Sequence, residues 1–222
     1  MNNHSLRQIA ANWVRTNCAQ GALQRSFLKE FDGAQRQQAN CSIALGKGMT
    51  KSGKACLVHF HGGQMFAFEL TPQQVKNLRV AANEMVFRQA LTANDGEPPE
   101  RAFVEIDHFV IEERRRFFLN APITGRHSYT VRQPFAGPMA LNLQVEIPDH
   151  GAMSGWQPFP ADLPPHGTLE FAFLPLRPSA RPTWHGTTAA FLQIRVAPGE
   201  GERDQRGVAL SNACCTLLDV LG

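Results

Sequence analysis

Two adjacent glycines, Gly62 and Gly63, separate two apolar runs, and this arrangement constrains the fold more than any other feature of the sequence. The runs cover residues 55–61 and 64–70, and both are rich in residues that favour β-strands. A two-residue hairpin turn needs positive φ angles, which glycine adopts without a Cβ clash. The sequence therefore predicts a β-hairpin in which the residues that flank the glycines face each other.

The alternation of side chains along a strand gives this hairpin two faces. One face carries Leu57, His59, His61, Gln64, Phe66 and Phe68. The other carries Cys56, Val58, Phe60, Met65 and Ala67. Since neither face is polar along its whole length, we expect the hairpin to be central in the sheet and covered on both sides, with the histidine face more open near the turn.

A helix is predicted to follow the hairpin over residues 72–91. Thr71 is a preferred N-cap, Pro72 suits the first helical position, and Gln74 completes a capping box. Apolar residues then recur at three- and four-residue steps, namely Val75, Leu78, Ala81, Ala82, Met85, Val86 and Ala90. This stripe predicts an amphipathic helix that packs against the hairpin.

The remaining segments complete an α+β prediction with antiparallel sheets. Helical patterns cover residues 6–19 and 22–31, and strand patterns cover 42–46 and 101–111. Ten of the fifteen prolines lie between Pro134 and Pro182, among strand-like runs at 127–132, 139–147, 168–176 and 187–196. These features predict a proline-rich antiparallel β meander. Apolar residues at helical spacing from Leu210 to Leu221 predict a C-terminal helix, with a strand over 208–214 as the alternative.

We therefore expect an α+β portion over residues 1–125 and a β-rich portion over 126–222, or one continuous domain. The five cysteines include no CxxC pair, and the N-terminus has no signal-peptide pattern, so a reduced cytoplasmic compartment, such as that of a bacterium, is expected. No apolar run is long enough to predict a transmembrane helix.

A histidine pair is the most suggestive arrangement for chemistry. His59 and His61 are two residues apart on one predicted strand, so both point the same way, and transition metals can use that spacing. A third and a fourth ligand are required, and Glu105, Asp107 and His108 are candidates by residue type, although Asp107 and His108 point to opposite faces of their strand. Glu105 and Asp107 could also act as paired carboxylates in metal-dependent chemistry.

Basic residues indicate a second kind of site, for nucleic acid. The net charge of +3 and the pI of about 8.7 are mildly basic. The loop over residues 47–54 does not make a phosphate-binding P-loop, because Lys54 leads into a strand rather than a helix. The candidate contacts are Lys47, Lys51, Lys54, Arg114, Arg115, Arg116, Arg126 and Arg132. Phenylalanines on the predicted strands could form a stacking platform for bases, or could simply pack in the core.

These patterns favour a non-enzymatic binding or assembly protein without a cofactor, which contacts nucleic acid as part of a larger complex with other protein subunits. One alternative is an enzyme that depends on a divalent transition metal bound by His59 and His61. The other is a purely structural subunit that self-assembles.

Overall fold

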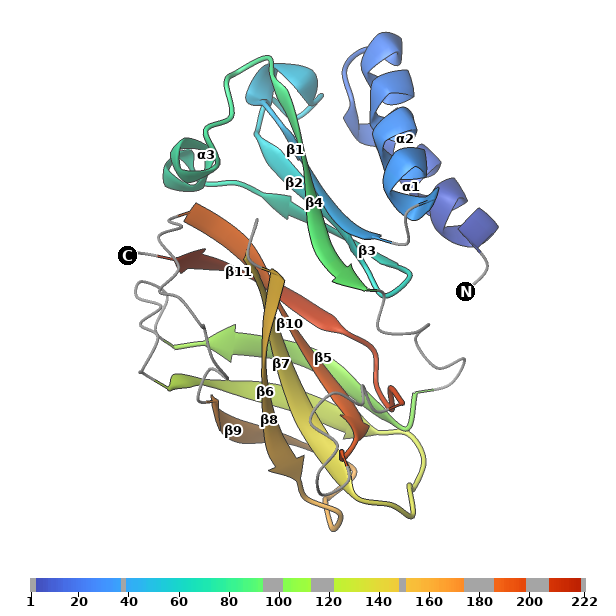
Figure 1. The fold of residues 1–222 in the computed structure, drawn as a ribbon, viewed down its shortest axis with the longest axis vertical. Coiled ribbons are helices and arrows are strands. Elements are labelled where there is room, and N and C mark those ends of the chain that lie inside the picture. Colours follow the sequence, from blue (N-terminus) through green and yellow to red (C-terminus); the bar gives the residue numbers. More distant parts are fainter. Residues whose placement is uncertain are drawn as a thin grey trace. The chain divides into compact units, whose positions relative to one another are not determined.

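The computed structural model describes residues 3–36, 39–93, 102–112, 122–147, 151–173, 186–198 and 208–220. The chain forms two compact units, unit 1 over Met1–Asn94 and unit 2 over Asp95–Gly222. As predicted, it is α+β, and its named strands pair antiparallel (Figure 1).

Unit 1 contains three helices and a four-stranded sheet. The helices are α1 (Asn3–Asn17), α2 (Gly21–Arg36) and α3 (Pro72–Leu78). The strands are β1 (Ala39–Leu45), β2 (Cys56–His61), β3 (Gln64–Glu69) and β4 (Met85–Ala93), arranged in the order β3-β2-β1-β4. The predicted hairpin is confirmed: β2 pairs with β3 with His61 opposite Gln64, and Gly62 and Gly63 have φ angles of 55° and 73°. It occupies one edge of the sheet rather than its centre.

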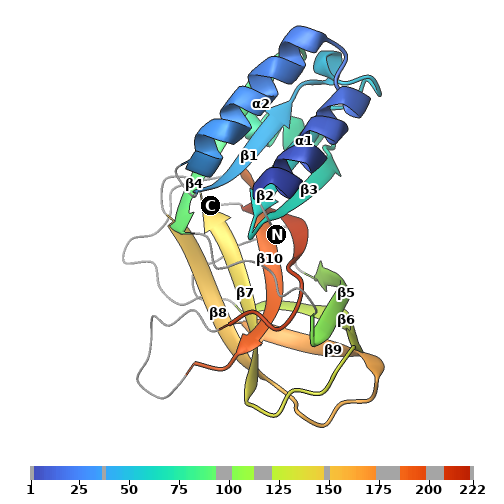
Figure 2. The same cartoon turned by 90° about the vertical axis from the view of Figure 1, so that its right-hand side faces the viewer.

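Helices α1 and α2 lie on the same side of this sheet (Figure 2). Their apolar stripes, which include Leu6, Phe27 and Phe31, pack on the sheet face that carries Val58 and Phe60. This packing covers one of the two hairpin faces. Helices α1 and α2 therefore pack against the hairpin, where the sequence predicted the helix over residues 72–91.

The helix predicted over residues 72–91 ends at Leu78, so the prediction is wrong beyond that residue. Its capping box forms as expected, with the Thr71 hydroxyl accepting a hydrogen bond from the Gln74 amide. Arg79 then adopts the left-handed conformation (φ 54°) and ends the helix, and Met85 begins β4, which pairs with β1. Met85 and Phe87 alternate toward the helix-covered face, so the apolar residues after Ala82 follow a strand period rather than a helical one.

Unit 2 is a β-sandwich. One sheet contains β5 (Val104–Ile111), β6 (Ile123–Val131) and β9 (His166–Phe173), in the order β5-β6-β9. The other contains β7 (Met139–Ile147), β8 (Gly151–Phe159), β10 (Gly186–Val196) and β11 (Cys214–Val220), in the order β11-β10-β7-β8. Strands distant in sequence, such as β6 and β9, are neighbours, as in Greek-key sandwiches. Inward side chains of both sheets form one core.

Three features of unit 2 differ from the sequence prediction. The C-terminal segment is strand β11, not a helix, because it pairs along its length with β10 and buries Leu218 in the core. Strand β8 was not predicted at all. Its glycines and Pro158 are poor strand formers, but among the described residues β8 pairs only with β7, and an edge strand tolerates proline. The strand at 104–111, expected in the first portion, pairs with β6 of unit 2.

Asn212 joins the two sheets of the sandwich through its side chain. Its Oδ1 accepts a hydrogen bond from the Ile106 amide at 2.8 Å, and its Nδ2 donates to the Ile106 carbonyl at 3.0 Å. Ile106 is buried and stands at an irregularity in the pairing of β5 with β6. The Asn212 side chain thus provides hydrogen-bond partners for the N–H and C=O groups of Ile106, which the pairing of β5 with β6 leaves without partners.

We expect Asn212→Ala to lower the free energy of unfolding by about 2 kcal/mol, since it removes two hydrogen bonds and leaves backbone groups of a buried residue unsatisfied. Urea unfolding followed by circular dichroism measures the change. Ser128→Ala is the matched control, because the Ser128 hydroxyl makes a long 3.4 Å bond to the His108 carbonyl at an exposed site. Equal, small effects of the two substitutions would contradict a structural role for Asn212.

Candidate functional site

The loop between β1 and β2 carries three of the predicted nucleic-acid contacts, and it is well ordered by hydrogen bonds. It begins with a short 3₁₀ turn over Lys47–Met49, and the Thr50 hydroxyl donates to the Lys54 carbonyl at 2.6 Å. The amide of Gly48 donates to the Ala82 carbonyl at 2.7 Å, which holds the loop against the segment between α3 and β4. The lysines are therefore presented from a fixed backbone.

This loop and α3 enclose a groove of about 740 Å³. Its apolar part is formed by Ala55, Leu70, Pro72, Val75, Ala81 and Ala82. Its charged lining residues are Lys47, Lys54 and Glu69. Two of the predicted lysines thus meet at one concave site, and the apolar residues beside them come from three segments that the sequence pattern did not bring together.

The electrostatics of the groove leave one positive charge in excess. Lys54 Nζ lies 2.7 Å from Glu69 Oε2, but both side chains are more than 60% exposed, so this ion pair contributes little. Lys47 is exposed and makes no ion pair with any described residue. Lys51 lies outside the groove lining and donates to the Arg15 carbonyl at 2.9 Å, which ties the loop to α1.

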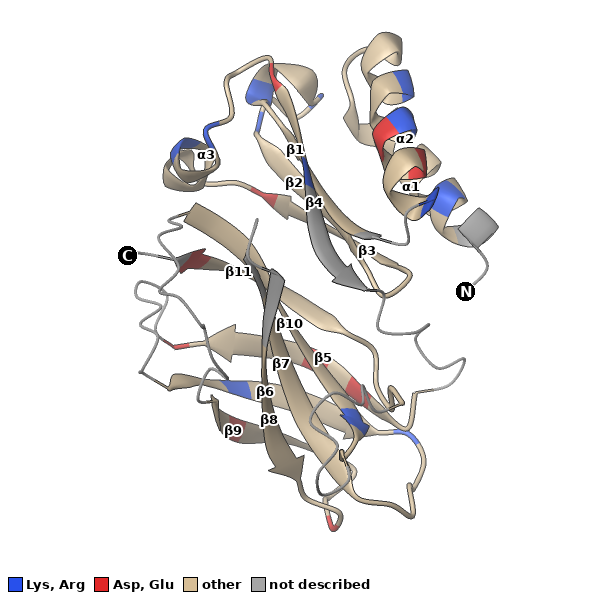
Figure 3. Cartoon of the chain, viewed as in Figure 1, with Lys and Arg blue, Asp and Glu red and all other residues tan. Residues whose placement is uncertain are grey.

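The two units carry opposite net charges. Residues 1–94 contain eleven Lys or Arg and four Asp or Glu, a net charge of +7. Residues 95–222 contain eleven Lys or Arg and fifteen Asp or Glu, a net charge of −4. Figure 3 shows described basic residues on the helices of unit 1 and on the loop before β2. The modest overall charge of +3 therefore conceals a strongly basic unit.

The predicted arginines belong to the acidic unit. Arg132 forms an ion pair with Glu105, with Nε 2.7 Å from Oε2. Arg126 is exposed on β6, and its register partner on β9 is Glu170. Arg114, Arg115 and Arg116 lie outside the described residues. Acidic neighbours weaken the case for Arg126 and Arg132 as phosphate contacts, whereas the lysines stand in the basic unit.

The predicted histidine pair is present but buried. The rings of His59 and His61 lie 6.3 Å apart, and the two residues are 1% and 4% exposed, so the expectation of an open histidine face is wrong for both. His59 Nδ1 shares a hydrogen bond with the Ser42 hydroxyl. Among the described residues, no group of three or more His, Cys, Asp or Glu is placed to hold a metal ion. Two histidines alone do not complete a metal site, which needs three or four ligands.

The other candidate ligands and the phenylalanine platform also have structural partners. In unit 2, Glu105 pairs with Arg132, and Asp107 accepts a hydrogen bond from Thr130 at 3.1 Å. Phe60 and Phe109 are buried in the cores of their own units, which confirms packing rather than base stacking for these two.

No protein-family model matches this chain, and no curated protein matches it. Within the part of the chain that the structure describes, no helix has the length and apolar character needed to cross a membrane.

Proposed function

We propose that this chain is a non-enzymatic binding protein that contacts nucleic acid through unit 1, at the groove between the 47–54 loop and α3. The observation that carries the proposal is the division of charge, +7 on unit 1 against −4 on unit 2. A polyanion gains most from a surface with an excess of positive charge, because each phosphate that is neutralised releases condensed counterions.

The composition of the groove supports nucleic acid over a simple anion. A single strand offers phosphates at regular intervals and flat apolar bases between them. The groove places Lys47 and Lys54 beside the apolar side chains of Leu70, Pro72 and Val75. Ammonium groups can contact phosphates while these apolar side chains contact a base or a sugar. Binding through such contacts is independent of sequence, because base edges are not read.

Assembly with other protein subunits in the cytoplasm belongs to the same proposal. Its support is the low content of charged residues, 18% of the chain, which suits surfaces that become buried against partners. Light scattering during size-exclusion chromatography distinguishes this arrangement from a purely structural subunit, which self-associates without binding nucleic acid.

We expect the combined substitution Lys47→Gln, Lys51→Gln and Lys54→Gln to weaken the binding of a labelled 20-nucleotide single strand at least tenfold at low salt. Three lost ammonium groups remove up to three phosphate contacts, each of which contributes to affinity through counterion release. Fluorescence anisotropy measures the binding, and circular dichroism checks that the variant is folded.

Arg126→Gln is the matched control, since it removes one exposed positive charge from unit 2. The control should bind like the unmodified protein. If it weakens binding as much as the triple substitution does, the groove is not the site of contact.

A further inference from the structure

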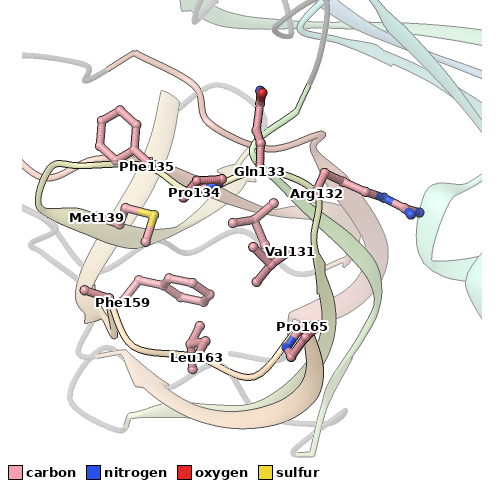
Figure 4. Close-up of a pocket in the computed structure, with 11 residues that line it drawn as sticks. Val131, Arg132, Gln133, Pro134, Phe135, Met139, Phe159, Leu163 and Pro165 are labelled. Carbon is pink, nitrogen blue, oxygen red and sulfur yellow. The ribbon is translucent and has the colours of Figure 1, made fainter.

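A second cavity lies at one end of the sandwich of unit 2, and nothing in the proposed function uses it. Figure 4 shows the side chains that line it, and its volume is about 330 Å³. It opens between the segment that follows β6 and the segment that precedes β9, which contribute Phe135 and Leu163 to its walls. Val104, Met139 and Phe159 also line it, and these three belong to the buried core. The cavity is thus a pocket open to solvent, whose lining includes part of the core and also the exposed residues Arg132, Pro134, Ala161 and Pro165.

The walls of the cavity are held in place by contacts outside it. The ring of Phe135 meets that of Phe103 edge-on, with centroids 5.2 Å apart and planes at 74°. The Val131 amide donates to the Pro165 carbonyl at 2.7 Å, and the Arg132 amide donates to the Phe103 carbonyl at 2.8 Å. These hydrogen bonds fix the two segments that border the cavity. A ligand would therefore enter a preformed space, and its binding would not have to order these segments.

Among the described residues, no charged side chain points into this space. Arg132 is the one described charged residue in the lining, and its guanidinium forms the ion pair with Glu105. Figure 4 shows the Arg132 side chain pointing away from the apolar side chains that surround the cavity. A charged ligand would lose its hydration here without gaining an opposite charge, so the site favours an uncharged ligand.

The size of the cavity bounds the ligand further. Apolar cavities of about 150 Å³ in another protein remain dry and accept benzene. A volume of about 330 Å³ is roughly twice that, and the lining includes the buried apolar side chains of Met139 and Phe159 beside the partly exposed Leu163. We propose that this cavity is a binding site for a small, uncharged, mostly apolar molecule of about two rings, separate from the nucleic-acid groove of unit 1.

The test uses Prodan, a neutral two-ring naphthalene derivative whose fluorescence rises in apolar surroundings, with the full chain. We expect saturable binding of one probe per chain with a Kd in the micromolar range. Leu163→Trp, which fills the cavity, should weaken binding at least tenfold, and Ala161→Trp should do the same from an exposed position at the cavity lining. Because Ala161 is exposed, its substitution does not depend on repacking the core.

Asp162→Trp is the matched control, since Asp162 stands between these two residues but is not part of the lining. It should bind the probe like the unmodified chain. Displacement by 1-naphthol and by 1-naphthoate tests the charge argument, and the neutral compound should compete at least tenfold better. The proposal is overturned if binding is not saturable, if neither filling variant weakens it, or if the two competitors are equally effective.

Discussion

Replacing His127 with leucine is expected to raise the stability of unit 2 at neutral pH and to remove most of its sensitivity to mild acid. His127 is 1% exposed, and neither of its ring nitrogens has a hydrogen-bond partner among the described residues. The rings of Tyr129, Phe159 and Phe171 surround it at centroid distances of 6.0 to 6.3 Å. A leucine would remove two unsatisfied polar atoms, a gain of about 1 kcal/mol or more.

The acid sensitivity follows from the same burial. Desolvation lowers the pKa of His127 from 6.5 to about 4. As the pH falls from about 6.5 to 4, the unfolded chain binds a proton that the folded unit does not, so stability is lost across this window. A difference of this size corresponds to about 3 kcal/mol, lost in the native protein and retained in His127→Leu.

Urea unfolding at pH 7.5 and pH 4.5 measures this effect. His166→Leu is the matched control, since His166 is exposed on β9, and it should keep the pH dependence of the unmodified protein. If His127→Leu loses as much stability between the two pH values as the native protein, the buried histidine is not the group responsible.

Gly125→Val is expected to cost about 3 kcal/mol or more, or to prevent unit 2 from folding. Gly125 lies on β6, the central strand of the three-stranded sheet, with Ile111 and Phe171 as its register partners. A Cβ at this position would lie 2.2 Å from the Val110 carbonyl oxygen and 2.5 Å from Cζ of Phe171. The carbonyl belongs to the neighbouring strand, so it cannot move away without disturbing the pairing of β5 with β6.

This result would oppose intrinsic propensity, since valine favours strands and glycine does not. Gly33→Ala in α2 is the matched control, because a Cβ there meets nothing within 4 Å and alanine favours helices. The control should be neutral or slightly stabilising in thermal unfolding. A loss below about 1 kcal/mol for Gly125→Val would show that the sheet adapts to a side chain at this site.

The parts of the fold that could be predicted are those decided by local geometry. The Gly62-Gly63 turn determines the hairpin register, and the capping box at Thr71 determines where α3 begins. The parts that failed were decided by distant partners. Strand β4 forms because β1 offers it a pairing edge, and β11 forms because β10 does, although both segments also have apolar residues at helical spacing.

The candidate site was only partly accessible from the sequence, for a similar reason. The 47–54 lysines were visible as a basic loop, but the groove also needs Leu70, Val75 and Ala81, which come together only in the folded unit. The difference in net charge between the two units was not visible in the sequence analysis, because the expected boundary at residue 125 lies inside unit 2. Divided at residue 125, the chain has net charges of +4 and −1, whereas division after residue 94 gives +7 and −4.

The most direct test of the central claim is the salt dependence of single-stranded oligonucleotide binding by the full chain. If unit 1 contacts phosphates through its lysines, the logarithm of the association constant should fall linearly with the logarithm of the salt concentration. A slope of about −2 or steeper is expected, since each phosphate contact adds about 0.7 for a single strand. Absence of binding at low salt, or an affinity that does not change with salt, would contradict the proposal that this basic unit binds nucleic acid.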